Sequence, residues 1–163
     1  LGVLNGTDTH TFSPDGTLTQ ARAVVLLYRC AGSPESGEEV TFSDVAQDAW
    51  CADAVAWAVE NGLVTGYEDN TFAPNAVITR QQLAAILYRY AQNEGYKTSQ
   101  SGKGTEGYLD ASSISSYAVK AMDWAVNAGL LSGKGNNTLA PTAGATRAEV
   151  AQIFMNFCED IAK

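Results

Sequence analysis

The chain has 163 residues, 45% of them hydrophobic, and a formal net charge of −8 at pH 7. This is enough apolar material for a buried core, while no apolar stretch approaches the roughly 20 residues that a membrane-spanning helix requires. The acidic balance argues against a nucleic-acid partner, because phosphates attract a basic surface. The composition therefore favours a compact, exported domain, and its many Ala, Gly and Thr residues suit a protein associated with a bacterial wall.

The first predicted element is a core helix in the apolar run 23–28. Thr19 precedes this run as a candidate N-cap, whose side-chain oxygen accepts a hydrogen bond from the first helical turn. Arg22 stands three residues after Thr19, where a capping box would have Glu or Gln. We therefore expect a simple cap at this helix start and no capping box.

The second predicted helix covers 50–60, where Trp50, Ala54 and Trp57 fall on one face at amphipathic spacing. Gly62 ends this helix, since glycine readily adopts the left-handed conformation that follows a helix. A long loop comes next and leads to the second copy of the capped helix start.

Thr79 begins a third helix, with Gln82 as its partner in a capping box and the apolar run 83–90 as its core face. The same order of elements then recurs. Its members are a helix over 117–127 with Tyr117, Ala121 and Trp124 on one face, a stop at Gly129, and a helix that Thr146 and Glu149 start and that includes the apolar run 150–157. All predicted elements are helices, so the expected fold class is all-α.

A short sequence at each capped helix start reveals an internal repeat. Ile78-Thr79-Arg80-Gln81-Gln82 recurs as Ala145-Thr146-Arg147-Ala148-Glu149 and, degraded, as Leu18-Thr19-Gln20-Ala21-Arg22. Flanking Gly, Thr, Pro and Trp positions match at shifts of about 60 and about 67 residues, so the repeat is a helix–loop–helix module. One module is too small to bury its own apolar stripe, and packing the copies around a shared axis would bury it.

We expect a single domain over 1–163, made of a partial unit 1–33 and two full units, 40–92 and 107–163, with linkers 34–39 and 93–106. The first helix of the first unit is missing and the chain has no initiator Met, so we interpret it as a fragment of a longer protein. The second linker is rich in Gly, Ser and Lys and is expected to be the most mobile segment. The incomplete first unit would leave an apolar seam open to self-association or helix swapping.

The three cysteines allow at most one internal disulfide. Cys30 and Cys51 are the candidate pair, because a bridge between them would join consecutive units. The alternative, which we favour, is that Cys30, Cys51 and Cys158 are free buried thiols. No C-x-x-C pair occurs and His10 is the only histidine, so we expect no metal site and no cofactor.

Several motifs recur together at constant spacing. They are the aromatic-x-Asp start at Phe42-Ser43-Asp44, a Trp-bearing helix, Gly-x-x-x-Gly-Tyr-x-x-x-x-Phe-x-Pro over 62–74, and Ile-Thr-Arg at 78–80. In combination they resemble the S-layer homology (SLH) domain, and the resemblance covers essentially the whole chain. It implies three units in a pseudo-threefold, three-pronged spindle around a central helical bundle, with the Thr-Arg strings lining grooves between the prongs.

The resemblance also implies a function. Its usual form is the non-covalent anchoring of an extracellular, cell-surface protein, in Gram-positive bacteria, to secondary cell-wall polysaccharide on peptidoglycan, often one that bears pyruvate ketals. A ketal carboxylate would be bound by a helix N-terminus with unpaired N–H groups and an adjacent Arg. This places Arg80 and Arg147 first among the candidate ligand-binding residues, each with its capping Thr79 or Thr146.

The remaining candidates follow by alignment of the copies. Gln20 replaces the Arg in the first copy and Arg22 falls two places later, so we expect at most two competent grooves. The turns Asn5-Gly6, Thr65-Gly66 and Ser132-Gly133 would let a sugar approach the backbone, and Lys134 would add a second cation.

Four further candidates have two interpretations each. Trp57 and Trp124 can stack on sugar faces, but their helical spacing favours core packing. Asp44 and Asp110 can contact a ligand, but a structural role is favoured, either capping the segment that follows or holding the arginines by ion pairing.

Two other functional classes were weighed. A protein assembly module, with grooves that bind a peptide or a sister subunit, remains open. An enzyme such as a glycosidase would need opposed carboxylates in one cleft. The repeated acids Asp44 and Asp110 belong to separate units instead, and His10 has no nucleophilic partner, so we predict no enzymatic activity.

Overall fold

The computed structural model describes residues 13–99 and 101–162. Over these residues the chain is helical, without strands or a sheet, which confirms the all-α prediction. The α-helices are α1 (Gln20–Cys30), α2 (Ala52–Glu60), α3 (Arg80–Asn93), α4 (Val119–Asn127) and α5 (Arg147–Asn156), with short 3-10 helices η1 (Ala111–Ser113) and η2 (Ser116–Ala118) and a π-helical turn η3 (Phe157–Ile161). None of the described helices has the length and apolar character needed to cross a membrane.

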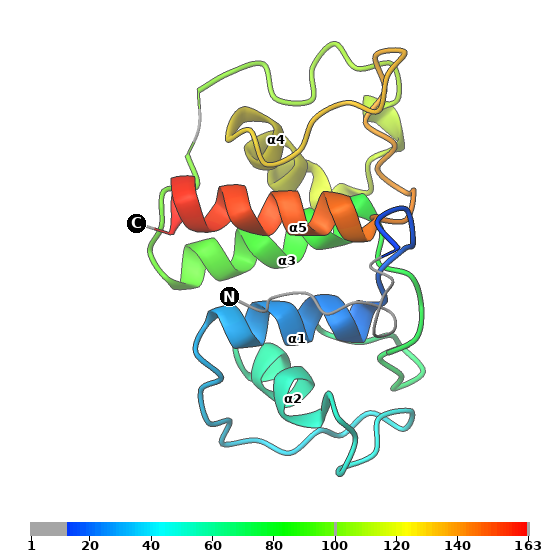
Figure 1. The fold of residues 1–163 in the computed structure, drawn as a ribbon, viewed down its shortest axis with the longest axis vertical. Helices are drawn as coiled ribbons and strands as arrows, with labels where there is room; N and C mark the ends of the chain where they lie inside the picture. Colours follow the sequence, from blue (N-terminus) through cyan, green and yellow to red (C-terminus); the bar gives the residue numbers. More distant parts are fainter. Residues whose placement is uncertain (1–12, 100, 163) are drawn as a thin grey trace.

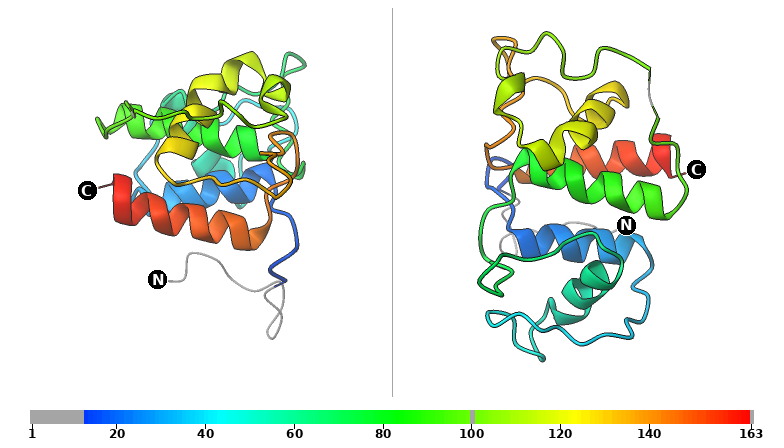
Figure 2. Two further views of the ribbon diagram at one scale, coloured as in Figure 1. Left: turned by 90° about the horizontal axis from the view of Figure 1, so that it is seen from above. Right: turned by 180° about the vertical axis from the view of Figure 1, so that it is seen from behind.

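The three capped helices form the centre of the molecule. Helices α1, α3 and α5 lie side by side and begin on the same side of the molecule, while α2 and α4 flank them on opposite sides (Figures 1 and 2). Equivalent positions of the three helices are buried. One such set is Ala23, Leu83 and Val150, and the next is Leu27, Leu87 and Phe154, all at most 4% exposed. The repeat in the sequence therefore supplies the central core.

The helix starts agree with the sequence. Thr79 accepts a hydrogen bond from the Gln82 N–H, and the Gln82 side chain accepts one from the Thr79 N–H, which confirms the capping box. Thr146 and Glu149 form the second one. Thr19 accepts a hydrogen bond from the N–H of the third helical residue and forms the simple cap that was predicted.

The three helix starts are also joined to one another. Leu18 donates its N–H to the carbonyl of Ala145 (3.1 Å), Ala145 donates to Ile78 (2.9 Å), and Ile78 donates to Leu18 (2.9 Å). These residues hold the same position in the three copies and are fully buried. The hydrogen bonds thus close a ring that contains one residue from each copy. The three-pronged spindle as a whole stays a prediction.

The prediction that Trp50 and Tyr117 lie on the amphipathic faces of the flanking helices was wrong. Helix α2 begins after Trp50, which is 65% exposed, and Tyr117 lies in η2 and is 51% exposed. The smaller neighbours, Cys51 and Ala118, take the buried positions and are 2% and 0% exposed. A small side chain therefore fills the buried position at the start of each flanking helix, and the aromatic residue before it is exposed.

The end of the second linker is held in place, although we expected this linker to be mobile. Thr105 donates from both its N–H and its hydroxyl to Asp123 Oδ1, at 2.8 and 2.6 Å, and Gly104 donates its N–H to Asn127 Oδ1 at 2.9 Å. Both acceptors belong to α4. The flanking helix of the last unit therefore fixes the chain that leads into that unit.

Candidate functional site

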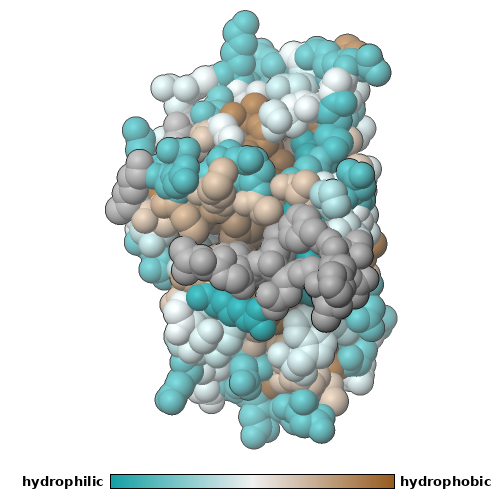
Figure 3. Space-filling view, viewed as in Figure 1, coloured by the Kyte–Doolittle hydropathy of each residue, from teal (hydrophilic) through white to brown (hydrophobic). Residues whose placement is uncertain are grey.

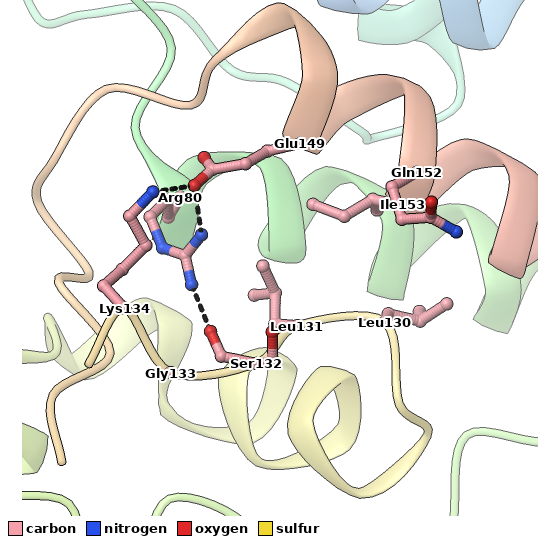
Figure 4. Close-up of a pocket in the computed structure, with 9 residues that line it drawn as sticks. All are labelled: Arg80, Leu130, Leu131, Ser132, Gly133, Lys134, Glu149, Gln152 and Ile153. Carbon is pink, nitrogen blue, oxygen red and sulfur yellow. Dashed lines mark hydrogen bonds and ion pairs between the residues drawn. The ribbon is translucent and has the colours of Figure 1, made fainter. Parts of the chain in front are cut away.

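A groove of about 310 Å³ opens between α5, α3 and the loop 130–134 (Figure 4). We name it the Arg80 groove. Its lining residues are Arg80, Leu130, Leu131, Ser132, Gly133, Lys134, Glu149, Gln152 and Ile153. It brings together three sequence candidates, Arg80, Ser132 and Gly133, and it places the fourth, Lys134, at the rim.

Arg80 forms one wall of this groove and is only 3% exposed. Its Nε donates to the Leu139 carbonyl at 2.8 Å, its Nη2 donates to the Ser132 carbonyl at 2.6 Å, and its Nη1 lies 3.2 Å from Glu149 Oε1. The guanidinium is thus engaged on all three nitrogens. Its contacts hold the loop and α5 in place and orient its positive charge at the base of the groove.

Glu149 lies between two cations. Its Oε1 contacts both Arg80 and the Nζ of Lys134. Burial by itself would raise the pKa of Glu149, but hydrogen bonds from Lys134 and from the Thr146 N–H, together with the Arg80 charge, lower it below the ordinary value. Glu149 is therefore ionised at neutral pH, and the three side chains carry one net positive charge. Because Lys134 is 41% exposed, it is the cation of this groove that solvent reaches most easily.

The predicted unpaired N–H groups at the helix starts are absent. Arg80 donates its N–H to the Ala143 carbonyl at 3.0 Å and Gln81 donates to Pro141 at 2.9 Å. Arg147 donates in the same way to Gly16 at 2.8 Å. The part of the hypothesis that relied on free helical N–H groups was wrong, because the loop of the neighbouring copy supplies carbonyl acceptors.

A second groove of about 370 Å³ repeats the construction one copy earlier. We name it the Gln20 groove. Its lining residues are Gln20, Leu63, Val64, Thr65, Gly66, Tyr67, Phe72, Gln82, Ala85, Ile86, Arg89 and Tyr117. Gln20 stands where the other groove has Arg80, and its Nε2 donates to the Tyr67 hydroxyl at 3.0 Å. An open groove therefore exists at the copy that we expected to be weakened.

The two grooves differ in charge at equivalent positions. In the Gln20 groove, Tyr67 takes the position of Lys134 and Gln82 takes that of Glu149. The charged pair of the Arg80 groove is therefore replaced by a neutral pair. The cation of the Gln20 groove is Arg89, whose Nη1 donates to the Leu63 carbonyl at 2.8 Å. Both grooves share a Gly after a hydroxyl residue, at Thr65-Gly66 and Ser132-Gly133.

Some lining residues were missed by the sequence reasoning. Tyr67 and Gln82 were available from the alignment, because a shift of about 67 residues places them on Lys134 and Glu149. Arg89 stands near the end of α3, where a cation commonly stabilises the helix dipole, so its position alone does not indicate a groove. Tyr117 comes from a different unit than the rest of its groove, and no sequence spacing indicates that contact.

Trp57 and Trp124 do not belong to either groove. They are 5% and 2% exposed. Trp57 packs against Tyr28 and Trp124 against Tyr88, each with ring centroids 5.5 Å apart. Their burial rules out stacking on a sugar in this structure, so the ligand interpretation was wrong and the packing interpretation holds.

Asp44 and Asp110 hold loops in place through backbone hydrogen bonds. Asp110 accepts the N–H groups of Leu139 and Ala140, at 2.8 and 2.7 Å, and Asp44 does the same for the equivalent residues 72 and 73, both at 2.8 Å. The hydrogen bond from Leu139 is the main cause that lowers the pKa of Asp110. The structural role is as favoured, but Asp110 does not cap the segment that follows it. After the loop hydrogen bonds, the charge of Arg80 also lowers the pKa of Asp110.

The remaining candidates lie elsewhere. Arg147 is 3% exposed, like Arg80. The turn Asn5-Gly6 lies outside the described residues. Arg22 is exposed on α1 and is absent from the lining of the two grooves. No group of His, Cys, Asp and Glu among the described residues is suited to a metal ion.

Comparison with known proteins gives one family. The model of the S-layer homology domain matches residues 41–84 and 107–151. The Surface-layer 125 kDa protein of Lysinibacillus sphaericus is 34% identical over 163 residues, which is 98% of this chain and 13% of that protein. The Cellulosome-anchoring protein of Acetivibrio thermocellus is 31% identical over 143 residues, 85% of this chain and 31% of that protein.

An enzyme matches in the same way. The Endoglucanase of Bacillus sp. (strain KSM-635) is 34% identical over 155 residues, 93% of this chain and 16% of the enzyme. The chain thus spans less than a third of the length of each of these relatives. Because the family model matches two segments and a surface-layer protein is 34% identical over 98% of this chain, the chain belongs to the S-layer homology domain family.

Proposed function

We propose that this chain is a cell-surface anchoring module that binds wall polysaccharide non-covalently, and that the Arg80 groove receives an acidic substituent such as the carboxylate of a pyruvate ketal. Family membership and the names of two relatives, a surface-layer protein and a cellulosome-anchoring protein, support the anchoring role. The chain corresponds to one part of each of those relatives, covering 13% and 31% of their lengths.

The observation that carries the ligand class is the charge of the Arg80 groove. Arg80, Lys134 and Glu149 sum to one positive charge on a protein whose net charge is −8. Because Arg80 is engaged with protein carbonyls, it acts as a fixed source of positive potential, while Lys134 can turn from Glu149 toward a ligand carboxylate. A charge-assisted hydrogen bond of this kind contributes about 1.5–3 kcal/mol.

The rest of the groove suits a sugar. Leu130, Leu131 and Ile153 form the buried apolar floor of the groove, each at most 5% exposed, and Ser132 and Gln152 are the exposed groups that can hydrogen-bond to a sugar. Figure 3 shows hydrophobic residues gathered in the upper half of the molecule, over the region of α4 and α5, within a mostly hydrophilic face.

The Gln20 groove completes the proposed surface. Tyr67 and Tyr117 are about half exposed, at 49% and 51%, and present rings to an uncharged sugar. Gln20 and Gln82 are neutral hydrogen-bonding partners in the same groove. Arg89 gives this groove a positive charge as well. We therefore assign to the Gln20 groove a sugar residue that stacks on its tyrosines, and to the Arg80 groove the acidic substituent, toward which the exposed Lys134 can turn.

The test is sedimentation with purified peptidoglycan that carries its polysaccharide, before and after mild acid removal of ketals. Lys134→Ala is expected to weaken binding to the untreated material about tenfold. Lys103→Ala removes the same charge from an exposed site outside both grooves and serves as the matched control, with unchanged binding expected. Acid treatment should lower wild-type binding to the Lys134→Ala level.

Two results would contradict the ketal assignment. One is wild-type binding that survives the acid treatment unchanged, and the other is an equal loss in the two lysine variants. Retention by surface-layer protein but not by glycan would contradict the anchoring mode as well, and would favour the protein assembly module.

A further inference from the structure

Two cysteines from opposite ends of the chain meet at one end of the central helices. Cys30 is the last residue of α1, and Cys158 lies in the π-helical turn η3 that follows α5. Helices α1 and α5 run side by side and end on the same side of the molecule (Figures 1 and 2). Burial raises the pKa of Cys30, and the charge and side-chain hydrogen bond of Cys158 raise it further, which is consistent with the two thiols lying close together.

The repeat explains why the two sulfurs meet. Cys30, Tyr90 and Phe157 hold equivalent positions at the ends of the three central helices. The Tyr90 and Phe157 rings are in contact, with centroids 6.1 Å apart, so this position faces the axis that the helices share. Cys158 directly follows Phe157. The sequence pairing of Cys30 with Cys51 is thereby replaced, since Cys51 is buried beside α2.

Packing holds one of the two cysteines in position. Phe157 is 2% exposed and its ring also contacts Tyr96 and Trp124, with centroids 6.2 and 6.4 Å apart. The backbone of Cys158 is therefore held in place, because the side chain of the residue before it is fixed by packing. Both Cys30 and Cys158 are exposed to solvent, so an oxidant can reach them, whereas the buried Cys51 is shielded.

We propose that Cys30 and Cys158 form a disulfide once the domain is outside the cell, linking the first copy of the repeat to the last. The pairing rests on the geometry, and only its timing rests on the proposed surface location, where disulfides persist. The sequence prediction of three free buried thiols then applies to Cys51 alone.

The oxidant is a disulfide, carried by a thiol–disulfide oxidoreductase or a small molecule. The thiolate of Cys158 attacks one sulfur of the oxidant, whose other sulfur leaves as a thiolate. The thiolate of Cys30 then attacks the Cys158 sulfur, the Cys30–Cys158 bond forms, and the second oxidant sulfur leaves. Two electrons and the two thiol protons pass to the oxidant, which ends as two thiols.

The environment of Cys30 assigns it the second step. Desolvation and, after it, the neighbouring Cys158 raise the pKa of Cys30 to about 11. At neutral pH this sulfur is almost entirely protonated and is a poor first nucleophile. Attack within a preformed pair compensates for the low thiolate fraction, because the two sulfurs are already neighbours.

The first test counts free thiols. The whole chain is oxidised with excess oxidised glutathione at pH 8, quenched with acid, unfolded, and labelled with a thiol-reactive polyethylene glycol. Of the three cysteines, the wild type should keep one free, and proteolysis should yield a linked peptide pair containing residues 30 and 158. Cys30→Ser and Cys158→Ser should give no linked peptide pair, and Cys30→Ser should retain a glutathione adduct at residue 158, because the thiol that would resolve the mixed disulfide is absent. Cys51→Ser should keep no free thiol.

Four outcomes would overturn the proposal. All four concern the oxidised wild type. They are three free thiols, a linked peptide that contains Cys51, covalent dimers, and stable glutathione adducts at residue 30 or 158. The peptide map of the wild type decides the pairing even if a variant folds poorly.

The second test measures stability. The bond would enclose most of the chain in one loop, which lowers the entropy of the unfolded state. Oxidised wild type should melt roughly 5–15 °C above its reduced form. Cys30→Ser and Cys158→Ser should melt at the same temperature with and without oxidant. If the wild type melts at the same temperature with and without oxidant although the bond is mapped, the bond did not form in the folded domain, and the proposal is contradicted.

Discussion

The Arg80 guanidinium lies 3.2 Å from the Glu149 carboxylate across the boundary between two copies of the repeat. The same guanidinium donates to two loop carbonyls while nearly all of its surface is buried. One side chain therefore connects a helix start, the opposite helix and the loop that forms the groove between them.

Arg80→Ala should consequently make the domain easier to unfold, with a loss of roughly 3–5 kcal/mol. The buried Leu139 carbonyl and the partly buried Ser132 carbonyl lose a charged donor, and Glu149 loses a partner. Urea denaturation followed by circular dichroism measures the change. Gln20→Ala at the equivalent position should cost no more than about 1 kcal/mol, since it removes one neutral hydrogen bond. Equal losses in the two variants would contradict the role given to Arg80.

The turn at the two grooves makes different demands on glycine. Gly66 has φ of +71°, and a Cβ there would lie 2.2 Å from Cε1 of Phe42. Gly133 has no positive φ, and a Cβ there would meet Tyr108 Cε1 at 3.1 Å. Gly66→Ala should therefore cost about 3 kcal/mol by overpacking and backbone strain, and Gly133→Ala about 1 kcal/mol or less. Chemical denaturation of both variants checks the order, and a larger loss for Gly133→Ala would refute it.

Acid should destabilise the domain through two carboxylates. Hydrogen bonds lower the folded-state pKa values of Asp110 and Glu149 below their ordinary values of 3.8 and 4.5. The resulting stability is fully present above the ordinary values and is lost as the pH falls through the lowered ones. Asp110→Asn should flatten the stability profile below pH 4, as measured by urea midpoints from pH 7 to pH 2. Asp48→Asn, at an exposed position, is the control and should keep the wild-type profile.

A substitution that adds a charge tests the different roles that we propose for the two grooves. Tyr67→Lys places an ammonium group beside the neutral Gln82, where no carboxylate matches Glu149. If the grooves bind polysaccharide as proposed, this variant should be retained several-fold more strongly on acidic wall glycan and should lose that gain at high salt. Tyr67→Met keeps the bulk without the charge. A gain of equal size in both variants would show that charge is not the cause.

The sequence predicted the parts of this fold that depend on local chemistry. The capping boxes at Thr79 and Thr146 and the glycine stop after α2 rest on hydrogen bonds within a few residues of each other, so their signals are complete in a short segment. The family follows from the same motifs, because their spacing is set by the length of one module.

What the sequence could not predict lies between the copies. The first N–H groups of α3 are bonded to carbonyls of the next copy, and Tyr117 reaches a groove built from other units. Cys30 meets Cys158 for the same reason, since equivalence of positions shows that two residues are alike but not that they are neighbours. Each of these depends on how the copies are arranged around one another, which no single repeat encodes.

The hydrogen-bonded ring formed by Leu18, Ile78 and Ala145 needs all three copies of the repeat. Each of these residues gives a hydrogen bond to one copy and accepts one from the other, so cutting out any copy removes two of the three bonds. Two copies would leave a buried donor and a buried acceptor without partners, and a fourth copy would find no place between them. The three helix starts of this chain therefore depend on one another, and the loss of one would weaken the seating of the other two.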